Sequence, residues 1–498
     1  MSSSERQLSQ TIAAVLALDG NAGALEYEQE WHTWGDLAAS ADALDDYVVP
    51  GTRVGVLLRN RPAHVGLLVG LLRAGACVVA INPGRGVDRV RAEVAKLNLP
   101  AVAGEPGDLE EFVQASVPCL KLASVELGAP ITASGHLLAG SVSHADGVAV
   151  EMLTSGTTGT PKRIPLSYQT LERVLTGAKY YERHAPNPVR LRTGVAIVNA
   201  PLVHLGGLFR VLQCVTDGRP FCLLERFRID EWVQAVRRHR PASLSLVPAA
   251  LRMVLEADLD RSDFSSVRSV ISGTAPLDPD DADAFMEKYG VPVLISYAAT
   301  EFGGGVAGWN LDDHRQFWAT KRGSVGRAHP GCELRVVDQH GDLLPPKDEG
   351  LLEVKAGQLG DNAEWTRTTD VARIDEDGFV WILGRADQAI IRGGFKVRPD
   401  DVRVALERDS RVRAAAVVGR IDHRLGAVPV AAVELRSGAA KTRSEDLLAK
   451  ASAILSPYEL PVEIRIMAAL PRTPSGKVDL VAVRDSFSIP DPKPVSND

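Results

Sequence analysis

Cysteine is scarce in this chain of 498 residues, and the cysteines that occur form no pattern. The five cysteines are odd in number, lie far apart and include no Cys-x-x-Cys pair. A disulfide framework or a cysteine-based metal site needs paired, closer spacing, so both are disfavoured. We expect reduced, mostly buried thiols, as in a cytoplasmic protein.

Long apolar runs and an excess of basic charge are also missing. The longest apolar stretch, residues 65–80, is interrupted by Arg73 and by three glycines, so it is too short and too broken to span a membrane. The net charge of −7 gives no bulk attraction to nucleic acid or to an anionic membrane. The N-terminal sequence MSSSERQLSQ lacks the basic and apolar segments of a secretory leader. We therefore expect a cytoplasmic, globular protein without stable membrane insertion or nucleic-acid partners.

The first two thirds of the chain alternate between strand and helix patterns. Apolar strand patterns at 53–58, 77–81 and 101–103 alternate with helical patterns at 62–73 and 89–97. This alternation predicts an α/β fold with parallel-type sheets flanked by helices, whose ligands bind at the carboxyl ends of strands. Further strand patterns lie at 194–198, 243–247, 267–271 and 293–296.

The pattern changes from about residue 323 onward. Short β-type segments at 332–337, 351–354 and 379–382 are joined by hairpin-like turns. After Gly384, strand and helix signals predict a separate α+β domain of about a hundred residues. The proline-rich, polar end of the chain is expected to be disordered.

One loop, residues 153–162 with the sequence LTSGTTGTPK, consists mostly of small and hydroxyl-bearing residues. Its glycines free the backbone to curl, so that hydroxyl and amide groups can surround an anion beside Lys162. The spacing differs from that of a P-loop, in which Gly-Lys-Ser/Thr opens a helix. By itself the segment fits either a polyphosphate-binding loop or a flexible surface turn.

A second motif, YAATE, lies at the end of a strand pattern. Tyr297 offers an aromatic face for a base, Thr300 a hydroxyl for phosphate, and Glu301 a carboxylate for Mg²⁺. An ordinary loop with a half-buried tyrosine would fit equally well.

Three further motifs carry charged groups. Asp370, in the sequence TTD, could accept ribose hydroxyls, and Arg385, in GRAD, could pair with a phosphate or ribose. Lys477, in PRTPSGK, is held on a turn by proline and glycine and could bridge two anions in a transition state. Taken singly, a solvated turn aspartate, a domain-edge ion pair and a surface lysine are the alternatives.

In their order along the chain, these motifs resemble the adenylate-forming (ANL) superfamily, in particular its AMP-forming acyl- and aryl-CoA synthetases. The resemblance covers residues 34–479, and the joint set of motifs is specific. It implies an acid–thiol ligase that uses ATP, Mg²⁺ and coenzyme A, with a small-molecule carboxylic acid and CoA as partners and possible homodimers. It also implies an N-terminal adenylation domain at 1–384 with a small β-barrel-like part, a hinge at 385–388, a mobile α+β domain at 389–487 and a disordered tail at 488–498.

The resemblance also implies roles for individual residues. Lys477, Glu301, Thr300 and His204 are the implied catalytic residues, with Glu301 also the metal ligand and Asp387 the hinge residue. The implied acid pocket comprises His204, Leu205, Gly206, Val247, Gly273, Gly303 and Gly304, and the implied CoA contacts are Arg392, Gly393, Gly394 and Phe395. The implied ATP and AMP contacts are Thr154, Ser155, Gly156, Thr157, Thr158, Gly159, Lys162, Gly273, Thr274, Ala275, Pro276, Ser296, Tyr297, Ala298, Thr300, Asp370, Ile382 and Arg385.

The implied reaction has two steps, acyl-AMP formation and then transfer to a thiol after the small domain rotates. The sequence IRGGFKVRP at 391–399 looks most like the CoA-ligase version, whereas transfer to a carrier protein or an amine is the alternative. A nucleotide-binding regulator without turnover is a second alternative, from a different functional class. The pocket residues are apolar or small, which favours an aryl, cyclic or medium-chain acid.

The sequence departs from the family pattern at four positions. Ala298 and Thr369 stand where glycine is usual, Arg163 stands where glycine is commonest, and Tyr168 replaces a frequent histidine. None of these changes removes a catalytic group, so we expect an active enzyme.

Overall fold

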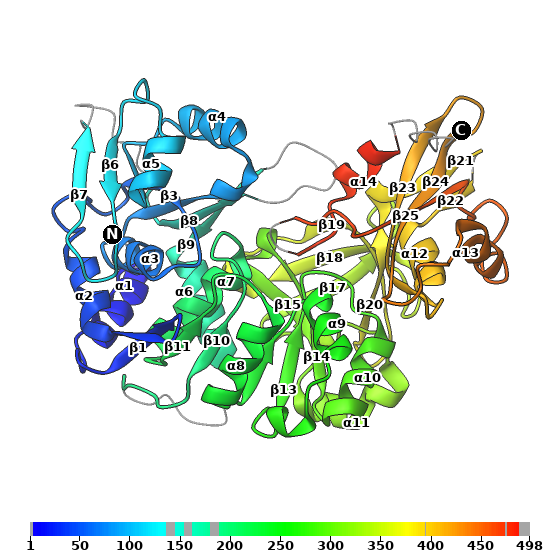
Figure 1. Cartoon of the computed structure of the whole chain (residues 1–498), viewed down its shortest axis with the longest axis horizontal. Coiled ribbons are helices and arrows are strands. Elements are labelled where there is room, and N and C mark those ends of the chain that lie inside the picture. The colour runs from blue at the N-terminus through cyan, green and yellow to red at the C-terminus, as the bar shows by residue number, and fades with distance from the viewer. Residues whose placement is uncertain are drawn as a thin grey trace, which may run out of the picture. The chain divides into compact units, whose positions relative to one another are not determined.

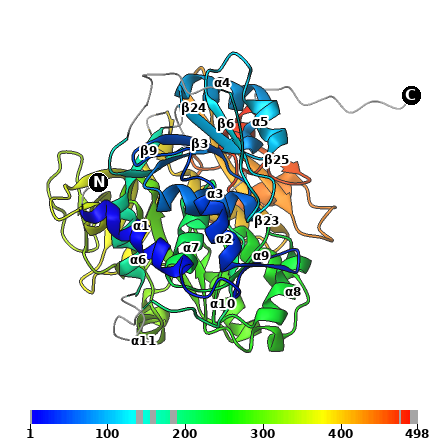
Figure 2. The ribbon, with the colours of Figure 1, turned by 90° about the vertical axis from the view of Figure 1, so that its left-hand side faces the viewer.

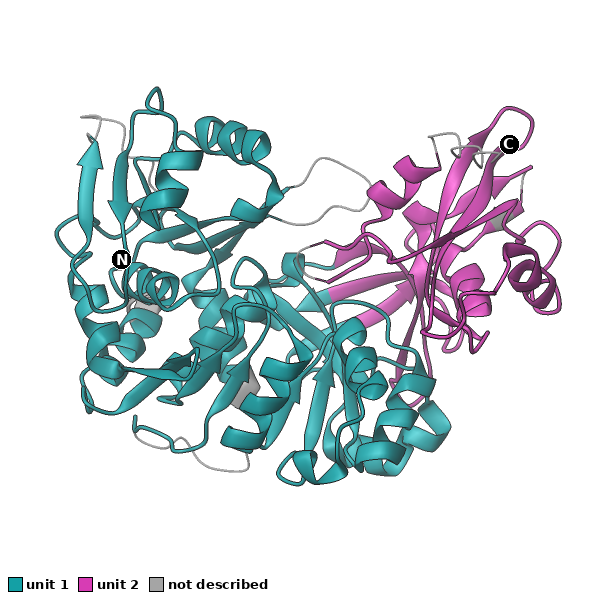
Figure 3. Ribbon diagram, viewed as in Figure 1, with its two compact units in different colours: residues 1–155, 161–333, 355–365 teal, residues 156–160, 334–354, 366–498 magenta. Residues whose placement is uncertain are grey.

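The computed structural model describes residues 3–135, 145–153, 162–179, 189–393, 395–473 and 476–487. The chain divides into two compact units (Figure 3). Unit 1 comprises residues 1–155, 161–333 and 355–365, and unit 2 comprises residues 156–160, 334–354 and 366–498.

The largest sheet of unit 1 has the strand order β7-β6-β5-β3-β4-β8-β9. Strands β6, β5, β3, β4 and β8 run parallel, and β7 and β9 pair antiparallel at the two edges. Helices α3 (Pro62–Arg73), α4 (Val87–Leu97) and α5 (Pro106–Phe112) make crossovers between them (Figure 1). In sheet order the strands are Thr132–Gly135, Leu120–Ala123, Ala101–Gly104, Arg53–Leu57, Cys77–Ile81, Val148–Leu153 and Arg163–Ser167.

A group of helices covers this sheet with apolar side chains. Helix α1 (Ser3–Leu16) contacts α3, α6 (Tyr168–Lys179) and α7 (Leu205–Thr216), as Figure 2 shows. Its buried Leu8, Ile12 and Val15 follow the helical period, which places them on one face. Helix α2 (Trp34–Asp42) begins at a capping box in which Thr33 and Asp36 satisfy each other's backbone N–H groups.

Two smaller sheets complete unit 1. The first has the order β10-β11-β1-β2, and the second has the order β12-β13-β14-β15-β16. A cluster of Trp232, Phe264, Phe285 and Tyr289 packs among the neighbouring helices, with 4.3 Å between the ring centres of Phe264 and Tyr289. The first sheet comprises Ala196–Val198, Phe221–Leu223, Gly23–Tyr27 and Glu30–Thr33, and the second Ser243–Ser245, Ser269–Ser272, Val293–Ala299, Gly304–Gly308 and Arg327–Ala328. The accompanying helices are α8 (Ile229–His239), α9 (Pro248–Glu256), α10 (Pro279–Tyr289) and α11 (Leu311–Lys321).

A sheet of order β17-β18-β19-β20, in which β18, β19 and β20 pair antiparallel, forms the first part of unit 2. Its strands are Cys332–Val337, Gly350–Ala356, Thr366–Ile374 and Val380–Arg385, with the start of β17 and the end of β18 assigned to unit 1. Asp375 closes the turn between β19 and β20, where its N–H donates to the carbonyl of Phe379 at 3.0 Å. This is the β-rich segment that the sequence predicted, including the hairpin-like turn at 376–378.

The second part of unit 2 is an α+β arrangement. Its sheet has the order β22-β21-β24-β23, and β25 pairs in parallel with β24. The core between the sheet and its helices contains the buried Val402, Leu406, Val417 and Val433. The strands are Ile390–Arg392 (β21), Phe395–Val397 (β22), Val412–Asp422 (β23), Gly426–Leu435 (β24) and Glu463–Met467 (β25), and the helices are Pro399–Glu407 (α12), Ser444–Ala451 (α13) and Leu480–Ser486 (α14).

The predicted α/β class is confirmed, and the predicted elements at 53–58, 62–73, 77–81 and 332–337 agree with the structure to within one residue. Among the described helices, none combines the length and the apolar character that crossing a bilayer requires. The predicted tail, 488–498, lies outside the described residues.

Candidate active site

Three parallel strands of unit 1 bring part of the predicted adenine and acid-pocket residues to one sheet edge. Strands β12, β13 and β14 pair in parallel, so the segments that follow their carboxyl ends are neighbours. Val247 follows β12, residues 273–276 follow β13, and Tyr297 lies near the end of β14. The sequence placed Tyr297 just after its strand, whereas β14 continues to Ala299 because it pairs there with β15.

The Gly273 loop is shaped by close backbone packing. A Cβ at Gly273 would lie 2.9 Å from the carbonyl oxygen of Ser296, so no side chain fits there. The next residue, Thr274, is exposed and has a φ of 72°, which is uncommon for a residue other than glycine. Strained backbone of this kind often marks a functional site, which suits the predicted contact with adenine.

Thr300 and Glu301 begin a short 3-10 helix, Thr300–Phe302, directly after β14. Gly303 ends this turn in the left-handed region with a φ of 72°, and Phe302 anchors it in the interior. The Glu301 side chain is exposed, and it makes no hydrogen bond or ion pair with the other described residues. A free carboxylate at the end of a strand fits the hard oxygen donors that Mg²⁺ prefers.

His204 directly precedes helix α7, at its N-cap position. The side chain is half-buried, and Leu205 and Gly206 form the first turn of the helix. Gly303 and Gly304 lie near helix α6, because a Cβ on either would contact Thr170 or Val174. Arg210 of α7 is half-buried and donates to Gln213 Oε1 at 2.7 Å.

The loop predicted to bind polyphosphate lies largely outside the described residues, since Thr154, Ser155, Gly156, Thr157, Thr158 and Gly159 are not described. Lys162, the last residue of the loop, is exposed. Arg163 then begins β9 and pairs with Glu93 at 2.5 Å, and it also donates to the carbonyl oxygen of Ala80 at 3.0 Å. The unusual arginine therefore ties the start of β9 to β4 and α4.

In unit 2, Arg385 is hydrogen-bonded to the predicted hinge residue and lies beside the predicted ribose residue in the sheet. Asp370 lies opposite Arg385 in the β19–β20 register. Arg385 donates to both carboxylate oxygens of Asp387, at 2.9 and 2.8 Å, and to Thr369 Oγ1 at 2.6 Å. Thr369 occupies the position where glycine is usual, so the departure supplies a partner for Arg385. Ile382 lies in the middle of β20 and is half-buried.

Lys477 lies on a tight turn of unit 2, as predicted from the flanking proline and glycine. Thr473 N–H donates to the Lys477 carbonyl at 2.7 Å, and Arg472 and Val478 form an antiparallel bridge. The half-buried Lys477 is therefore on a constrained backbone rather than on a helix face.

The predicted CoA contacts lie at the hairpin between β21 and β22, of which Gly394 is outside the described residues. Arg392 Nη1 donates to the backbone carbonyls of Pro457, Tyr458 and Leu460 at 3.3, 2.9 and 3.0 Å, so this guanidinium fixes the hairpin to the 457–460 segment. Gly393 has a φ of 57°, and the exposed Phe395 stacks on Tyr458 with ring centres 4.8 Å apart.

The structure also gathers one cluster that the sequence analysis missed. Glu26, Cys222 and His239 come from β1, β11 and α8, and Glu26 pairs with His239 Nε2 and with Arg238, each at 2.5 Å. These residues are far apart in the sequence and belong to no motif, so only the tertiary structure reveals them. One carboxylate oxygen of the buried Glu26 pairs with the Arg238 guanidinium and the other contacts His239, whose pKa is lowered by burial. Both oxygens are thus already engaged by the protein, which indicates a structural cluster.

Comparison with known proteins identifies the family of this chain. A model of the AMP-binding enzyme family matches residues 13–360, and the model of the AMP-binding enzyme C-terminal domain matches residues 404–477. The chain belongs to the AMP-binding enzyme family. It is an AMP-forming ligase of the acyl-CoA synthetase type, a class that uses ATP, Mg²⁺ and CoA, and these predictions from the sequence are confirmed.

Three similar proteins illustrate the range of this AMP-binding family. A sulfoacetate–CoA ligase of Cupriavidus necator is 30% identical over 476 residues, covering 90% of this chain and 91% of the relative. A 4-coumarate–CoA ligase of Oryza sativa subsp. japonica is 28% identical, covering 86% of this chain and 84% of the relative. The solved structure of the amide bond synthetase McbA from Marinactinospora thermotolerans has a TM-score of 0.77 and 28% identity, covering 96% of this chain and all of that chain (100%).

Proposed function

We propose that this AMP-binding enzyme activates a hydrophobic carboxylic acid (aryl, cyclic or medium-chain) as acyl-AMP and then transfers the acyl group to coenzyme A. The observation that carries the proposal is the shared sheet edge of the Gly273 loop, Tyr297 and the Thr300–Glu301 turn. This edge offers the bare backbone of Gly273, the aromatic face of Tyr297 and the carboxylate of Glu301, which has no partner among the described residues.

In the first step, a carboxylate oxygen of the acid attacks the α-phosphorus of ATP, and pyrophosphate leaves. Tyr297 and the Gly273 loop would hold the adenine, and Asp370 with Arg385 would hold the ribose. Both reactants are anions, so the transition state needs positive charge, which we assign to Lys477. Mg²⁺ held by Glu301 would supply further charge neutralisation when bound.

In the second step, the thiol of CoA attacks the acyl carbonyl carbon, a thioester forms, and AMP leaves with the bonding electrons. We assign Gly393, Gly394 and Phe395 to the approach of the thiol arm, because glycines leave room beside the backbone. A change of backbone conformation at Asp387 is the proposed link between the two steps. Arg392 would contribute by fixing the hairpin.

The acid is proposed from the character of the pocket residues. Leu205, Gly206, Val247, Gly303 and Gly304 are apolar or small, which favours an apolar acid with some bulk. The 4-coumarate–CoA ligase supports an aryl acid, whereas the sulfoacetate–CoA ligase is a relative that acts on a small polar acid. A cytoplasmic location, a homodimer and the domain limits 1–384, 385–388 and 389–487 remain our predictions.

An amine is the second candidate acceptor, and one observation favours it. The amide bond synthetase McbA matches the fold over nearly its full length at 28% identity. An enzyme of that kind would pass the acyl group from the adenylate to an amine nitrogen. The two candidates share the first step and differ only in the second.

The test is a screen in two stages. Purified enzyme is incubated with ATP, Mg²⁺ and a panel of aryl, cyclic, medium-chain and short polar acids, and hydroxylamine traps the acyl-AMP as a hydroxamate. The best acid is then offered CoA, or a panel of amines, and the products are identified by mass. We expect hydroxamate with apolar acids and acyl-CoA with CoA; amide formation without any thioester would favour the second candidate.

A further inference from the structure

Asn60 is a buried polar residue between β3 and α3, and the proposed mechanism gives it no role. Its side chain is 5% exposed. The residue lies in the short connection that follows β3, two residues before Pro62 opens helix α3. A buried amide is costly unless it is fully hydrogen-bonded, so its partners indicate what it does.

The Asn60 amide bonds to two segments that lie about 140 to 165 residues further along the chain. Its Nδ2 donates to the carbonyl oxygens of Ala200 and Leu224, at 3.0 Å each. Its Oδ1 accepts the N–H of Leu202 at 2.8 Å. One side chain therefore joins the segment after β10 to the end of β11.

The segment that Asn60 holds, residues 200–204, ends at His204. Leu202 is completely buried, and His204 N–H donates to the Pro201 carbonyl at 3.0 Å. On the other side, Gly207 of α7 packs against the segment, since a Cβ there would lie 2.2 Å from the Pro201 oxygen. The backbone before His204 is thus fixed by Asn60 on one side and by the first turn of α7 on the other.

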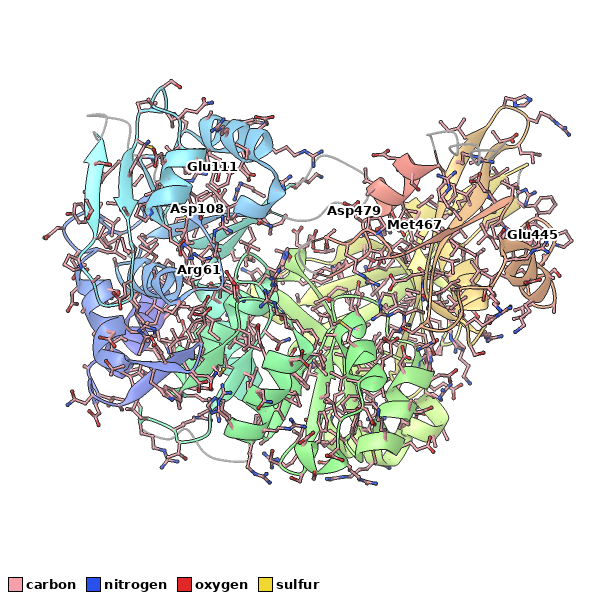
Figure 4. The ribbon with its side chains drawn as sticks, viewed as in Figure 1. Arg61, Asp108, Glu111, Glu445, Met467 and Asp479 are labelled. Carbon is pink, nitrogen blue, oxygen red and sulfur yellow. The ribbon has the colours of Figure 1, made fainter. Side chains whose placement is uncertain are left out.

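The residues on both sides of Asn60 are themselves anchored. Arg59 makes two hydrogen bonds to Asp108, both at 2.7 Å. Arg61 pairs with Glu105 at 2.7 Å and with Glu225 at 3.1 Å, and Glu225 is the residue after Leu224. Arg61 and Asp108, which take part in these ion pairs, are labelled in Figure 4. The position of the Asn60 amide is therefore set by ion pairs on either side of it.

We propose that Asn60 is a positioning residue that sets the placement of His204 and, through it, the binding of the acid. The inference rests on the proposed function, in which His204 lines the acid pocket. It predicts that Asn60 acts on the acid and not on ATP, because its partners include no residue assigned to the nucleotide.

The experiment measures the KM for the best acid and the KM for ATP separately, by hydroxamate formation, in three variants. Asn60→Asp keeps the size and the acceptor for Leu202, but it turns a carboxylate oxygen toward the carbonyls of Ala200 and Leu224. Asn60→Ser removes most of the contacts without adding charge, which provides a second variant if the first fails to fold. Thr216→Val is the matched control, because it removes a buried hydroxyl at the far end of the same helix α7.

We expect both Asn60 variants to raise the KM for the acid about tenfold and to leave the KM for ATP within about twofold of wild type. Thr216→Val should lower the melting temperature without changing either KM. An unchanged acid KM in a folded Asn60 variant, or an equal rise in both KM values, would overturn the inference while leaving the proposed function intact. A wild-type enzyme that forms no hydroxamate with any acid would instead remove the proposed function, and this inference with it.

Discussion

The guanidinium of Arg385 donates two hydrogen bonds to the carboxylate of Asp387, from Nε to Oδ1 at 2.9 Å and from Nη2 to Oδ2 at 2.8 Å. The two residues flank the end of β20 and the start of the segment that we propose as the hinge. Their side chains are 36% and 26% exposed, so the pair contributes at most about 1 kcal/mol to stability. A change at Asp387 should therefore alter function more than folding.

Asp387→Pro should slow thioester formation about tenfold or more and leave adenylation nearly unchanged, because proline fixes φ and would restrict a backbone rotation there. Pyrophosphate exchange reports the first step, and CoA consumption from supplied acyl-AMP reports the second. Asp387→Ala is the control, since it removes the pair with Arg385 but leaves the backbone free. If both variants slow the second step equally, the side chain rather than the hinge motion is responsible.

Lys477→Ala should reduce adenylation by about a hundredfold to a thousandfold, because it removes the cation that we assign to the transition state of the first step. Thioester formation from supplied acyl-AMP should be largely spared. Lys441→Ala, which removes an exposed lysine of the same unit, should change neither step. Near-normal pyrophosphate exchange in Lys477→Ala would show that the assignment is wrong.

Gly273→Ala should raise the KM for ATP about tenfold, because the added Cβ would force the loop away from β14. The clash is with the Ser296 carbonyl oxygen, at 2.9 Å. Gly107→Ala is the comparison, since a Cβ there meets no atom within 4 Å. An unchanged KM for ATP in Gly273→Ala would argue against adenine binding at this loop.

His64 should make the stability of unit 1 sensitive to acid. Burial lowers the pKa of His64 to about 4, and its Nδ1 accepts the N–H of Arg59 at 3.2 Å. The unfolded chain, with a pKa near 6.5, takes up a proton that the folded chain excludes, so the free energy of unfolding falls as the pH drops from 6.5 toward 4. Between pH 7 and pH 5 the loss should approach about 2 kcal/mol.

The variant His64→Asn keeps an acceptor for Arg59 but does not titrate. Its urea midpoint should be lower at pH 7 and should depend less on pH between 7 and 5 than that of the wild type. Equal pH dependence in the two proteins would assign the acid sensitivity to other groups.

The elements that the sequence predicted well depend on local patterns. Helix α3 starts at Pro62, and strand β4 is an unbroken apolar run at 77–81. The apolar pattern and the proline are therefore enough to predict both elements from the sequence. Helix α1, at 3–16, was not predicted, and it packs against α3, α6 and α7, which lie far from it in the sequence. The predicted strand at 293–296 ends before β14 does, since β14 continues to Ala299. Its last residues are held in the extended conformation by pairing with β15, which the local sequence pattern does not show.

For the proposed site, the motifs indicated candidate groups but not the residues that hold them in place. Tyr168, which replaces a frequent histidine, is buried and donates its hydroxyl to the Ala76 carbonyl at 2.7 Å. Arg163 likewise bonds to Ala80 and Asn60 to Ala200, 83 and 140 residues away in the sequence. Such contacts depend on the tertiary fold, and no spacing within the sequence reveals them.

Acid-dependent exchange between ATP and radiolabelled pyrophosphate reports acyl-AMP formation, and it is measured with the acid panel for the wild type and the Lys477→Ala variant side by side. We predict exchange with one or more apolar acids in the wild type, no exchange without acid, and loss of exchange in the variant. Tight ATP binding without exchange for any acid would contradict the account and would favour a nucleotide-binding regulator.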